Sequence, residues 1–156
     1  MSTTINQFQG DYRFLSNFYK CDVVYEGVEY KSAEHAFQAS KTTSLQWRDD
    51  IASMRTPGLA KRIGRQCPIR RNWEVIRVKI MEEVVWCKFY QNGVLGKKLV
   101  DTYPVKLVEG NVWHDTFWGV DLETGVGENT LGKILMKVRR KLRRWVGRGG
   151  IHGILR

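Results

Sequence analysis

The sequence predicts one α+β domain that is mainly helical and carries short strands near its start. Three features indicate this fold class: segments with the apolar spacing of helices, two strand-like runs around a glycine turn, and the absence of repeats or linkers. A chain of 156 residues can bury a core without disulfide or metal support. We therefore expect a single domain over residues 1–156, in which the glycine-rich segment 147–156 is a flexible tail.

The first third of the chain predicts a hairpin that leads into a short helix. Strand-like runs at 21–25 and 28–30 flank Glu26-Gly27, a pair that favours a tight turn. Ser32 is a candidate N-cap, because its hydroxyl can accept a hydrogen bond from a backbone amide in the first turn of the helix. The residues expected to pack inward from this helix are Ala33, Ala36, Phe37 and Ser40.

Further helices and one strand are expected along the rest of the chain. The helices end or begin at Pro57 and at Asn92-Gly93, which are typical stop and start signals. The expected helices span 46–55, 57–64, 71–91, 94–102 and 129–146, and the strand spans 106–109. The inward residues are Trp73, Ile76, Ile80, Val84 and Cys87 in the long helix, and Leu131, Ile134, Leu135, Val138, Leu142 and Trp145 in the last one.

Basic residues concentrate on the other face of the last helix. The chain has a formal net charge of +10, and residues 133–148 contain eight lysines and arginines and no acid. Such a face attracts polyanions such as nucleic acid, or smaller phosphorylated ligands. It also fits an ordinary solvated helix face, and charge alone does not decide between the two.

The apolar and cysteine patterns predict a cytoplasmic protein without a membrane anchor. The apolar runs fall far short of the roughly 18 residues that cross a bilayer. The start of the chain, MSTTINQFQGDY, lacks the basic and apolar regions of a signal peptide. Cys21, Cys67 and Cys87 are an odd number of cysteines at unrelated spacings, so reduced thiols are expected.

Standard catalytic and metal-binding motifs are mostly absent. The sequence has no P-loop and no GxSxG, HExxH or CxxC motif. His35, His114 and His152 are too far apart in sequence to predict a metal cluster. The Gly125-Val126-Gly127 segment follows no clear strand, which favours a flexible loop over a dinucleotide site. We expect no metal and no redox cofactor.

A polar stripe on the helix after Ser32 is the first candidate site. Glu34, Gln38 and Lys41 are spaced i, i+4 and i+7, within about 60° of each other at ~100° per residue. This pattern fits a catalytic carboxylate beside an amide and an amine. It also fits a purely structural Glu34, since an acid in the first turn complements the helix dipole.

An aromatic segment, WHDTFWG at residues 113–119, is the second candidate site. Tryptophan and phenylalanine faces suit a flat base or the apolar face of a sugar, and the Asp115 carboxylate suits a hydroxyl or a developing positive charge. The alternative is a loop whose aromatic side chains fill the core while Asp115 caps a turn.

The two candidates together suggest glycosidic cleavage. This reaction passes through an oxocarbenium-like state, so that one carboxylate can stabilise the cation while another group transfers a proton. Lys41 offers a second route. If its pKa were lowered, its amine could attack the anomeric carbon and form a transient Schiff base.

Five sequence blocks follow one another within residues 8–142: FLSNFY, YKSAEHAFQASK, LVEGN, DTFWG and GENTLGKILMKVR. In this order they resemble the NADAR family, which includes YbiA-type N-glycosidases. The resemblance implies a mainly helical α+β fold and hydrolysis of N-glycosidic bonds to ribose. It implies two substrate classes: phosphorylated intermediates of riboflavin biosynthesis, and guanine bases of nucleic acid that carry ADP-ribose.

The matching blocks also imply functional residues. We assign Glu34 as the acid–base group or water activator, Lys41 as an electrophilic or covalent partner, and Asp115 as the group that stabilises the ribosyl cation or holds a ribose hydroxyl. Trp118 would stack on the base or sugar, and exposed amides at the start of the last helix would bind a phosphate. The implied substrate-binding residues are Asn17, Phe18, Gln38, Trp113, Trp118, Gly119, Asn129 and Gly132.

Three functions are left open by these observations. An N-glycosidase acting on a small phosphorylated ribosylamine needs a phosphate pocket but no extended basic surface. A hydrolase that removes ADP-ribose from guanine in DNA makes better use of the basic last helix, and its activity should fall steeply with salt. A non-catalytic module would bind ADP-ribose, NAD or nucleic acid, but the joint presence of Glu34, Lys41 and Asp115 argues against it.

Overall fold

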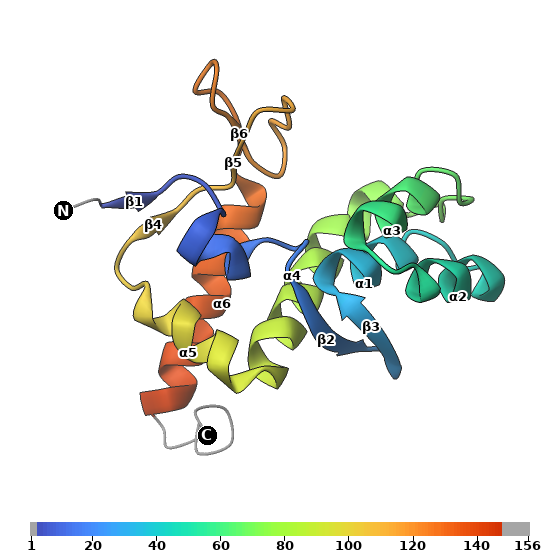
Figure 1. The fold of residues 1–156 in the computed structure, drawn as a ribbon, viewed down its shortest axis with the longest axis horizontal. Coiled ribbons are helices and arrows are strands. Elements are labelled where there is room, and N and C mark those ends of the chain that lie inside the picture. Colours follow the sequence, from blue (N-terminus) through green and yellow to red (C-terminus); the bar gives the residue numbers. More distant parts are fainter. Residues whose placement is uncertain (1–2, 148–156) are drawn as a thin grey trace. The chain divides into compact units, whose positions relative to one another are not determined.

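Residues 3–147 are described by a computed structural model, drawn as a ribbon in Figure 1. The chain forms two compact units, one of Asn17–Asn92 and the other of Met1–Ser16 with Gly93–Arg156. Helices and short strands occur in both units, which confirms the predicted α+β class. Most of the expected tail, 148–156, lies outside the described residues. The expectation of a single domain stays a prediction.

The unit Asn17–Asn92 begins with the predicted hairpin. Strand β2, Lys20–Tyr25, pairs antiparallel with β3, Val28–Ser32. The turn residues Glu26 and Gly27 have φ angles of 50° and 78°. Positive φ at both central positions is the mark of a type I′ turn, which matches the twist of the two strands. The hairpin prediction is confirmed.

Helix α1, Ala33–Ala39, follows the hairpin and is buried along its whole length. Ser32 caps it as predicted, since its Oγ accepts a hydrogen bond from the backbone N–H of His35 at 3.1 Å. The helix contacts both hairpin strands and helices α2, α3 and α4. The residues expected to pack inward, Ala33, Ala36, Phe37 and Ser40, are buried as predicted. The rest of α1 is buried too, because the helix is surrounded by other elements of its unit.

Three further helices complete this unit: α2, Leu45–Ser53, α3, Pro57–Gly64, and α4, Trp73–Gln91. The Ser44 and Thr56 side chains cap α2 and α3 by accepting hydrogen bonds from the backbone. The three predicted helices agree with these bounds to within about two residues, an ordinary uncertainty for helix ends.

The inward face of α4 differs in part from the expected one. Trp73, Ile80 and Val84 are buried as predicted, whereas Ile76 and Cys87 are only half-buried. The expected positions 73, 80 and 87 form a seven-residue repeat, which drifts by about 20° per heptad around a straight helix. The remaining buried residues of α4 are Met81, Val85, Lys88 and Phe89.

The other unit contains two short parallel strand pairs. Strand β1, Thr4–Ile5, pairs with β4, Lys106–Leu107, and β5, Gly110–Asn111, pairs with β6, Val120–Asp121. The expected strand at 106–109 is shorter in the structure, because a tight turn ends it. In that turn the Gly110 N–H donates to the Val108 carbonyl oxygen at 2.9 Å.

The second unit also contains three helical segments within the described residues. A 3₁₀ helix, Gly10–Leu15, follows β1, and α5, Gly93–Asp101, precedes β4. The last helix, α6, is Thr130–Gly147 and contacts α5 and β4. Its buried apolar residues are the predicted Leu131, Ile134, Leu135, Val138 and Leu142.

Two side chains of α6 differ from the prediction. Trp145 is 41% exposed, because it lies in the last turn and about 60° around the helix from Leu142. Arg139 is buried, although a basic residue of this helix was expected in solvent. Its guanidinium donates to Thr102 Oγ1 at 3.0 Å and to the Val105 carbonyl oxygen at 2.7 Å.

The thiol and membrane expectations have different outcomes. Cys21, Cys67 and Cys87 are free cysteines, as predicted. Within residues 3–147, no helix combines the length and apolarity needed to cross a bilayer. The expected cytoplasmic location stays a prediction.

Candidate active site

A buried carboxyl group lies in the first turn of α1. Glu34 is only 6% exposed, and its backbone N–H donates to the Asn17 carbonyl oxygen at 3.1 Å. One turn later, Gln38 Nε2 donates to Glu34 Oε1 at 2.7 Å. Because Ser32 fixes the start of α1, these contacts orient the carboxyl group within the folded protein.

The other end of the Gln38 carboxamide packs against α3. A Cβ built at Gly64 would overlap Gln38 Oε1, so glycine is what allows α3 to approach α1 this closely. Within residues 3–147, no hydrogen-bond donor reaches this buried oxygen. An unsatisfied buried acceptor costs about 1–3 kcal/mol, so a donor group on a ligand that reached it would be stabilised.

Burial and nearby cations shift the pKa of Glu34 in opposite directions. Burial raises the pKa of the Glu34 carboxyl above its ordinary value of 4.5, while the hydrogen bond from Gln38 lowers that pKa. The positive charges that also lower it belong to Lys61, Lys41 and Arg65. The net direction of the pKa shift is upward, so this carboxyl group holds a proton more readily than an exposed glutamate does.

Lys41 lies just past α1 in the same environment. Its backbone carbonyl accepts a hydrogen bond from the Arg70 N–H at 2.8 Å. Burial lowers the pKa of the Lys41 amine below 10.5, and the Glu34 carboxylate opposes this shift. A lower pKa increases the fraction of free amine, the nucleophilic form. The predicted helical stripe is wrong at Lys41, because α1 ends at Ala39, but the two charges still interact.

Asn17 and Phe18 belong to the same unit as Glu34. Besides accepting from the Glu34 backbone, Asn17 donates from Nδ2 to Met81 Sδ at 3.2 Å and is buried. Phe18 is 39% exposed, and Lys61 Nζ lies 5.8 Å from the centre of its ring. Phe18 therefore offers an accessible aromatic surface next to one of the cations that act on Glu34.

The aromatic segment of the second unit is organised by Asp115. One oxygen of this carboxylate, Oδ1, accepts hydrogen bonds from the backbone N–H groups of Phe117 and Trp118 at 3.0 and 2.9 Å. Phe117 and Trp118 contact edge to face at 4.8 Å between ring centres, and Trp113 is 57% exposed. The two backbone hydrogen bonds are those expected if Asp115 caps a turn, which was the alternative to a role in catalysis. Oδ2 takes no part in the two backbone bonds.

The start of α6 does not present exposed amides. The N–H groups of Thr130 and Leu131 donate to the carbonyl oxygens of Phe117 and Trp118 at 3.1 and 2.9 Å. Asn129 is buried, with hydrogen bonds from the Glu109 N–H and to the Leu107 carbonyl oxygen. The expectation of a phosphate site on these amides is therefore wrong.

Two glycines carried over from the sequence blocks are buried at close backbone contacts. A Cβ at Gly119 would overlap Glu109, and a Cβ at Gly132 would overlap Asn129 and the Leu107 carbonyl oxygen. The geometry gives both glycines a packing role. Their expected substrate contacts stay a prediction.

The predicted site residues thus fall into two groups. Glu34, Gln38, Lys41, Asn17 and Phe18 lie in the unit Asn17–Asn92. The first group combines a buried acid with an amine, which are functional groups that acid–base chemistry uses. The second unit holds the remaining residues, which are Trp113, Asp115, Trp118, Gly119, Asn129 and Gly132.

One trio in the second unit has its ligand atoms close together. Single ligand atoms of His114, Asp121 and Glu123 lie within 4.8 Å of one another. His114 Nδ1 and Asp121 Oδ2 are 2.8 Å apart, and Asp121 Oδ1 accepts from the Glu123 N–H at 2.9 Å. These hydrogen bonds account for the arrangement, and His114 and Glu123 are exposed. We do not assign the trio as a metal centre.

Lys61 and Arg65 are the site cations that sequence reasoning missed. They are four residues apart on and just after α3, so they project on the same side of that helix. Nothing local connects them with Glu34, because the link is the packing of α3 on α1. Gly64 is a partial signal, since a glycine at a helix end also marks close approach of backbones.

A buried acid with a raised pKa beside a lysine with a lowered pKa is an arrangement of acid–base or covalent catalysis. On this α+β fold it defines the class of protein as a candidate enzyme. A family model described as NADAR domain matches residues 5–143, and the chain belongs to the NADAR family. The resemblance inferred from the five blocks is confirmed.

Several known proteins are similar to this chain. N-glycosidase YbiA of Escherichia coli is 36% identical over 147 residues, 91% of each chain. N-glycosidase Npun_R5314 of Nostoc punctiforme is 32% identical over 146 residues, 90% of this chain and 92% of the relative. Riboflavin biosynthesis protein VVA0006 of Vibrio vulnificus is 37% identical over 131 residues, 83% of this chain and 35% of that protein.

A solved structure supports the fold as well. The NMR structure of the E. coli protein YbiA matches with a TM-score of 0.82 and 35% sequence identity. The match covers 92% of this chain and 88% of that one. The predicted mainly helical α+β fold is confirmed.

Proposed function

We propose that this protein is an enzyme of the N-glycosyl hydrolase type, which cleaves the bond between C1 of a ribose and a base nitrogen. The observation that carries the proposal is the environment of buried Glu34 and half-buried Lys41, in which the pKa of the acid is raised and that of the amine is lowered. Relatives named N-glycosidase, aligned over 91% and 90% of this chain, support the type of bond.

Glu34 and Lys41 admit two routes for this reaction. In the first, protonated Glu34 gives its proton to the leaving nitrogen as C1 gains oxocarbenium character, and the carboxylate then takes a proton from the attacking water. In the second, the free amine of Lys41 attacks C1 and the base leaves with the proton from Glu34. The C1–O4′ bond of the ribose then breaks as the ring oxygen takes a proton from the amine, and water hydrolyses the Schiff base so formed.

The proposed substrate is a phosphorylated ribosyl compound. Lys61 and Arg65 place positive charge around Glu34, and an anionic group on the substrate would be attracted to them. A phosphorylated intermediate of riboflavin biosynthesis carries such an anionic group. The Vibrio relative named a riboflavin biosynthesis protein supports this class, although the chain spans only 35% of that protein.

A second substrate class, ADP-ribosylated guanine in nucleic acid, is favoured by one observation. Helix α6 has no acidic residue and presents several exposed cations, which suits a polyanion. A third function is binding of ADP-ribose, NAD or nucleic acid without chemistry. Such a function would need neither the raised pKa of Glu34 nor the lowered pKa of Lys41.

Asp115 and Trp118 keep their proposed roles as a separate hypothesis. The free Oδ2 of Asp115 could stabilise a ribosyl cation or hold a ribose hydroxyl, and the Trp118 ring could stack on the base or sugar. Asp115→Asn preserves an oxygen for the backbone bonds to Phe117 and Trp118 but removes the charge. A loss of kcat at unchanged thermal stability is the result expected for a direct role.

A release assay by mass spectrometry tests the proposed chemistry. Two substrates are offered: the phosphorylated ribosylamino-pyrimidine and an oligonucleotide with ADP-ribosylated guanine. Wild type should release the base from one of them, and Glu34→Gln should lower the rate at least ~10²-fold if Glu34 transfers a proton. Borohydride added during turnover should trap a ribosyl adduct on Lys41 if the Schiff-base route operates.

Matched controls separate the site from general effects. Glu29→Gln, an exposed acid in the same unit, should retain wild-type turnover, and so should Lys79→Met, an exposed amine. Normal turnover in Glu34→Gln would reject its role as the acid–base group. Tight binding of either substrate with no product from wild type would replace the enzyme by the binding module.

A further inference from the structure

A pocket with three arginines in its wall lies where α5 and α6 end. Its volume is ≈ 420 Å³. We call it the arginine pocket, and its lining residues are Val100, Arg140, Arg143, Arg144, Val146 and Gly147. Both helices belong to the second unit. The pocket includes none of the residues that we propose for the glycosidase reaction.

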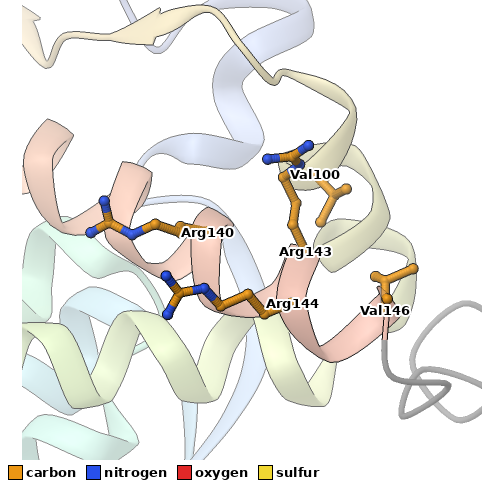
Figure 2. Close-up of a pocket in the computed structure, with 6 residues that line it drawn as sticks. Val100, Arg140, Arg143, Arg144 and Val146 are labelled. Carbon is orange, nitrogen blue, oxygen red and sulfur yellow. The ribbon is translucent and has the colours of Figure 1, made fainter.

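The three arginines do not converge on one point. Figure 2 shows Arg140 and Arg144 extending to the same side of α6, while Arg143 reaches toward Val100 on α5. Arg140 and Arg144 are four residues apart, which corresponds to about 6 Å along a helix at 1.5 Å per residue. A ligand with one anionic group can meet only part of this set. A ligand with several anionic groups along a chain can meet all three.

The arginines of the pocket are not neutralised by the protein. Within residues 3–147, no ion pair joins a carboxylate to Arg140, Arg143 or Arg144. Asp101, an acid at the end of α5, pairs instead with Lys97 at 2.7 Å. The pocket therefore presents positive charge that an anionic ligand can use.

An aromatic ring holds Arg143 in place. The Arg143 guanidinium lies 3.3 Å from the centre of the Tyr103 ring, and buried Arg139 lies 5.6 Å from the same centre. A stacked guanidinium keeps its charge and its N–H donors, and its planar fork matches a carboxylate. Burial and then the charge of Arg143 lower the pKa of Arg139. An anion bound at Arg143 would offset this repulsion between the two cations.

The pocket also has apolar walls. Val100 and Val146 line it beside the arginines, and each is half-buried. Among the described residues, no lysine lines the pocket. Arginine beside apolar and aromatic side chains, with lysine depleted, is the composition of protein–protein interface cores.

The combination of arginines and valines favours a peptide over a chain of phosphates. A phosphate chain would place polar oxygens against Val100 and Val146, which gain nothing from that contact. The exposed Tyr103 ring already contacts two guanidinium groups, so it is a poor surface for stacking a base. A peptide can supply carboxylates and aliphatic side chains together, and so cover both parts of the wall.

We propose that the arginine pocket binds an acidic segment of a partner protein, in which glutamate or aspartate side chains alternate with aliphatic ones. One carboxylate pairs with the stacked Arg143 through two parallel N–H···O bonds, and others pair with Arg140 and Arg144. An aliphatic side chain packs on Val100 and Val146. This binding does not depend on the proposed glycosidase chemistry, since binding and cleavage are measured separately.

Fluorescence anisotropy with labelled synthetic peptides tests this binding. The probe is a glutamate-rich peptide with a leucine at every third or fourth position. It should bind saturably, and replacing its glutamates by glutamine or its leucines by serine should each weaken binding at least ~10-fold. No saturable binding of the probe up to about 1 mM would overturn the proposal. Equal binding of the leucine and serine peptides would overturn it in favour of general attraction of anions.

A double variant tests the arginines without disturbing the ring contact. R140Q/R144Q leaves Arg143 on Tyr103, so it should unfold at the wild-type temperature. It should weaken binding of the probe at least ~10-fold, because two charge-assisted contacts are lost. Wild-type affinity in this variant would overturn the proposal.

The matched control removes two arginines from the other unit. Arg55 and Arg71 are exposed, and R55Q/R71Q should bind the probe with the wild-type Kd. Equal weakening by the two double variants would overturn the proposal, because the probe would then be responding to the net charge of the protein.

A valine variant tests the apolar wall. Val100→Ser should weaken the leucine peptide several-fold and leave the affinity for the serine peptide unchanged. Val94→Ser is the control, since Val94 is a 69% exposed residue of the same helix that does not line the pocket. Equal effects of the two serine variants would contradict a contact between the partner and the pocket.

Two further probes separate the partner from other polyanions. A single-stranded oligonucleotide of the same net charge and vesicles of an anionic phospholipid should both bind less tightly than the leucine peptide. If either bound more tightly and lost its affinity in R140Q/R144Q, the pocket would be a phosphate site and the proposal would be overturned.

Discussion

At the scale of single residues, the burial that suits Glu34 to its proposed catalytic role also reduces the stability of the folded protein. Burial raises its pKa above the ordinary 4.5, so the folded protein holds this proton more tightly than the unfolded chain does. The stability that the protonated group contributes is fully present below pH 4.5 and is lost as pH rises through the folded pKa. Functional groups held in such environments commonly reduce stability.

Glu34→Gln should therefore be more stable than wild type near neutral pH. The amide can keep an acceptor for Gln38 Nε2 but cannot ionise, so its advantage should shrink as the pH falls toward about 4. Melting temperatures measured at about pH 4, 5.5 and 7 check this, at roughly 2–4 °C for each kcal/mol. Glu29→Gln is the exposed control and should show no such trend. An advantage of equal size at every pH would contradict the prediction.

Single residues also show which contacts of the site can be predicted from the sequence. Glu34 and Gln38 were predictable as neighbours, because i, i+4 spacing is local. Lys61 and Arg65 were not, since their effect on Glu34 depends on the packing of α3. Lys88 lies between these cases. It is fully buried, with a pKa lowered to about 8 by burial, and it follows Val84 by one helical turn on the inward face, so that a strict 3.6-residue period indicates its burial.

At the scale of elements, the contact between α1 and α3 supports the site. Gly64→Ala would place a Cβ on the Gln38 carboxamide, and overpacking of this kind costs about 1–3 kcal/mol. We expect lower stability and a loss of kcat/KM, because Gln38 cannot keep its hydrogen bond to Glu34 if it moves. Thermal unfolding and steady-state kinetics of the purified variant measure both effects.

Gly58→Ala is the matched control on the same helix. A Cβ there has no neighbour closer than 4.0 Å, so alanine should be neutral or slightly stabilising. Equal losses of activity in the two variants would show that helix α3 as a whole, and not the contact with Gln38, is responsible.

The elements differ in how far they were predictable, for physical reasons. Helices α1, α2 and α3 begin close to their predicted positions because Ser32, Ser44 and Thr56 are local N-caps. The two-residue strands were not predicted well. Thr4 pairs with Lys106, about a hundred residues away, and no local pattern records such a pairing.

At the scale of the whole molecule, the fold class was predictable but the division into units was not. Composition, length and helical periodicity are properties that a single sequence displays. The second unit instead combines Met1–Ser16 with Gly93–Arg156, and such an arrangement follows from long-range packing. The family match covers residues 5–143 and so includes parts of both units.

The net charge of the whole chain leads to a prediction about association. At +10, the protein attracts anionic substrates over a distance set by salt, about 30 Å at 0.01 M and 8 Å at 0.15 M ionic strength. For a phosphorylated ribosyl substrate, kcat/KM should fall several-fold over this range while kcat stays constant, because screening slows encounter and leaves the chemistry at Glu34 unchanged. Stopped-flow or steady-state kinetics at several salt concentrations measures both constants.

The same compound without its phosphate is the control, and its kcat/KM should depend little on salt, since only the anion is attracted. If both compounds lost kcat/KM equally, salt would be acting on the fold or on the site, and electrostatic attraction of the phosphate would be excluded as the cause.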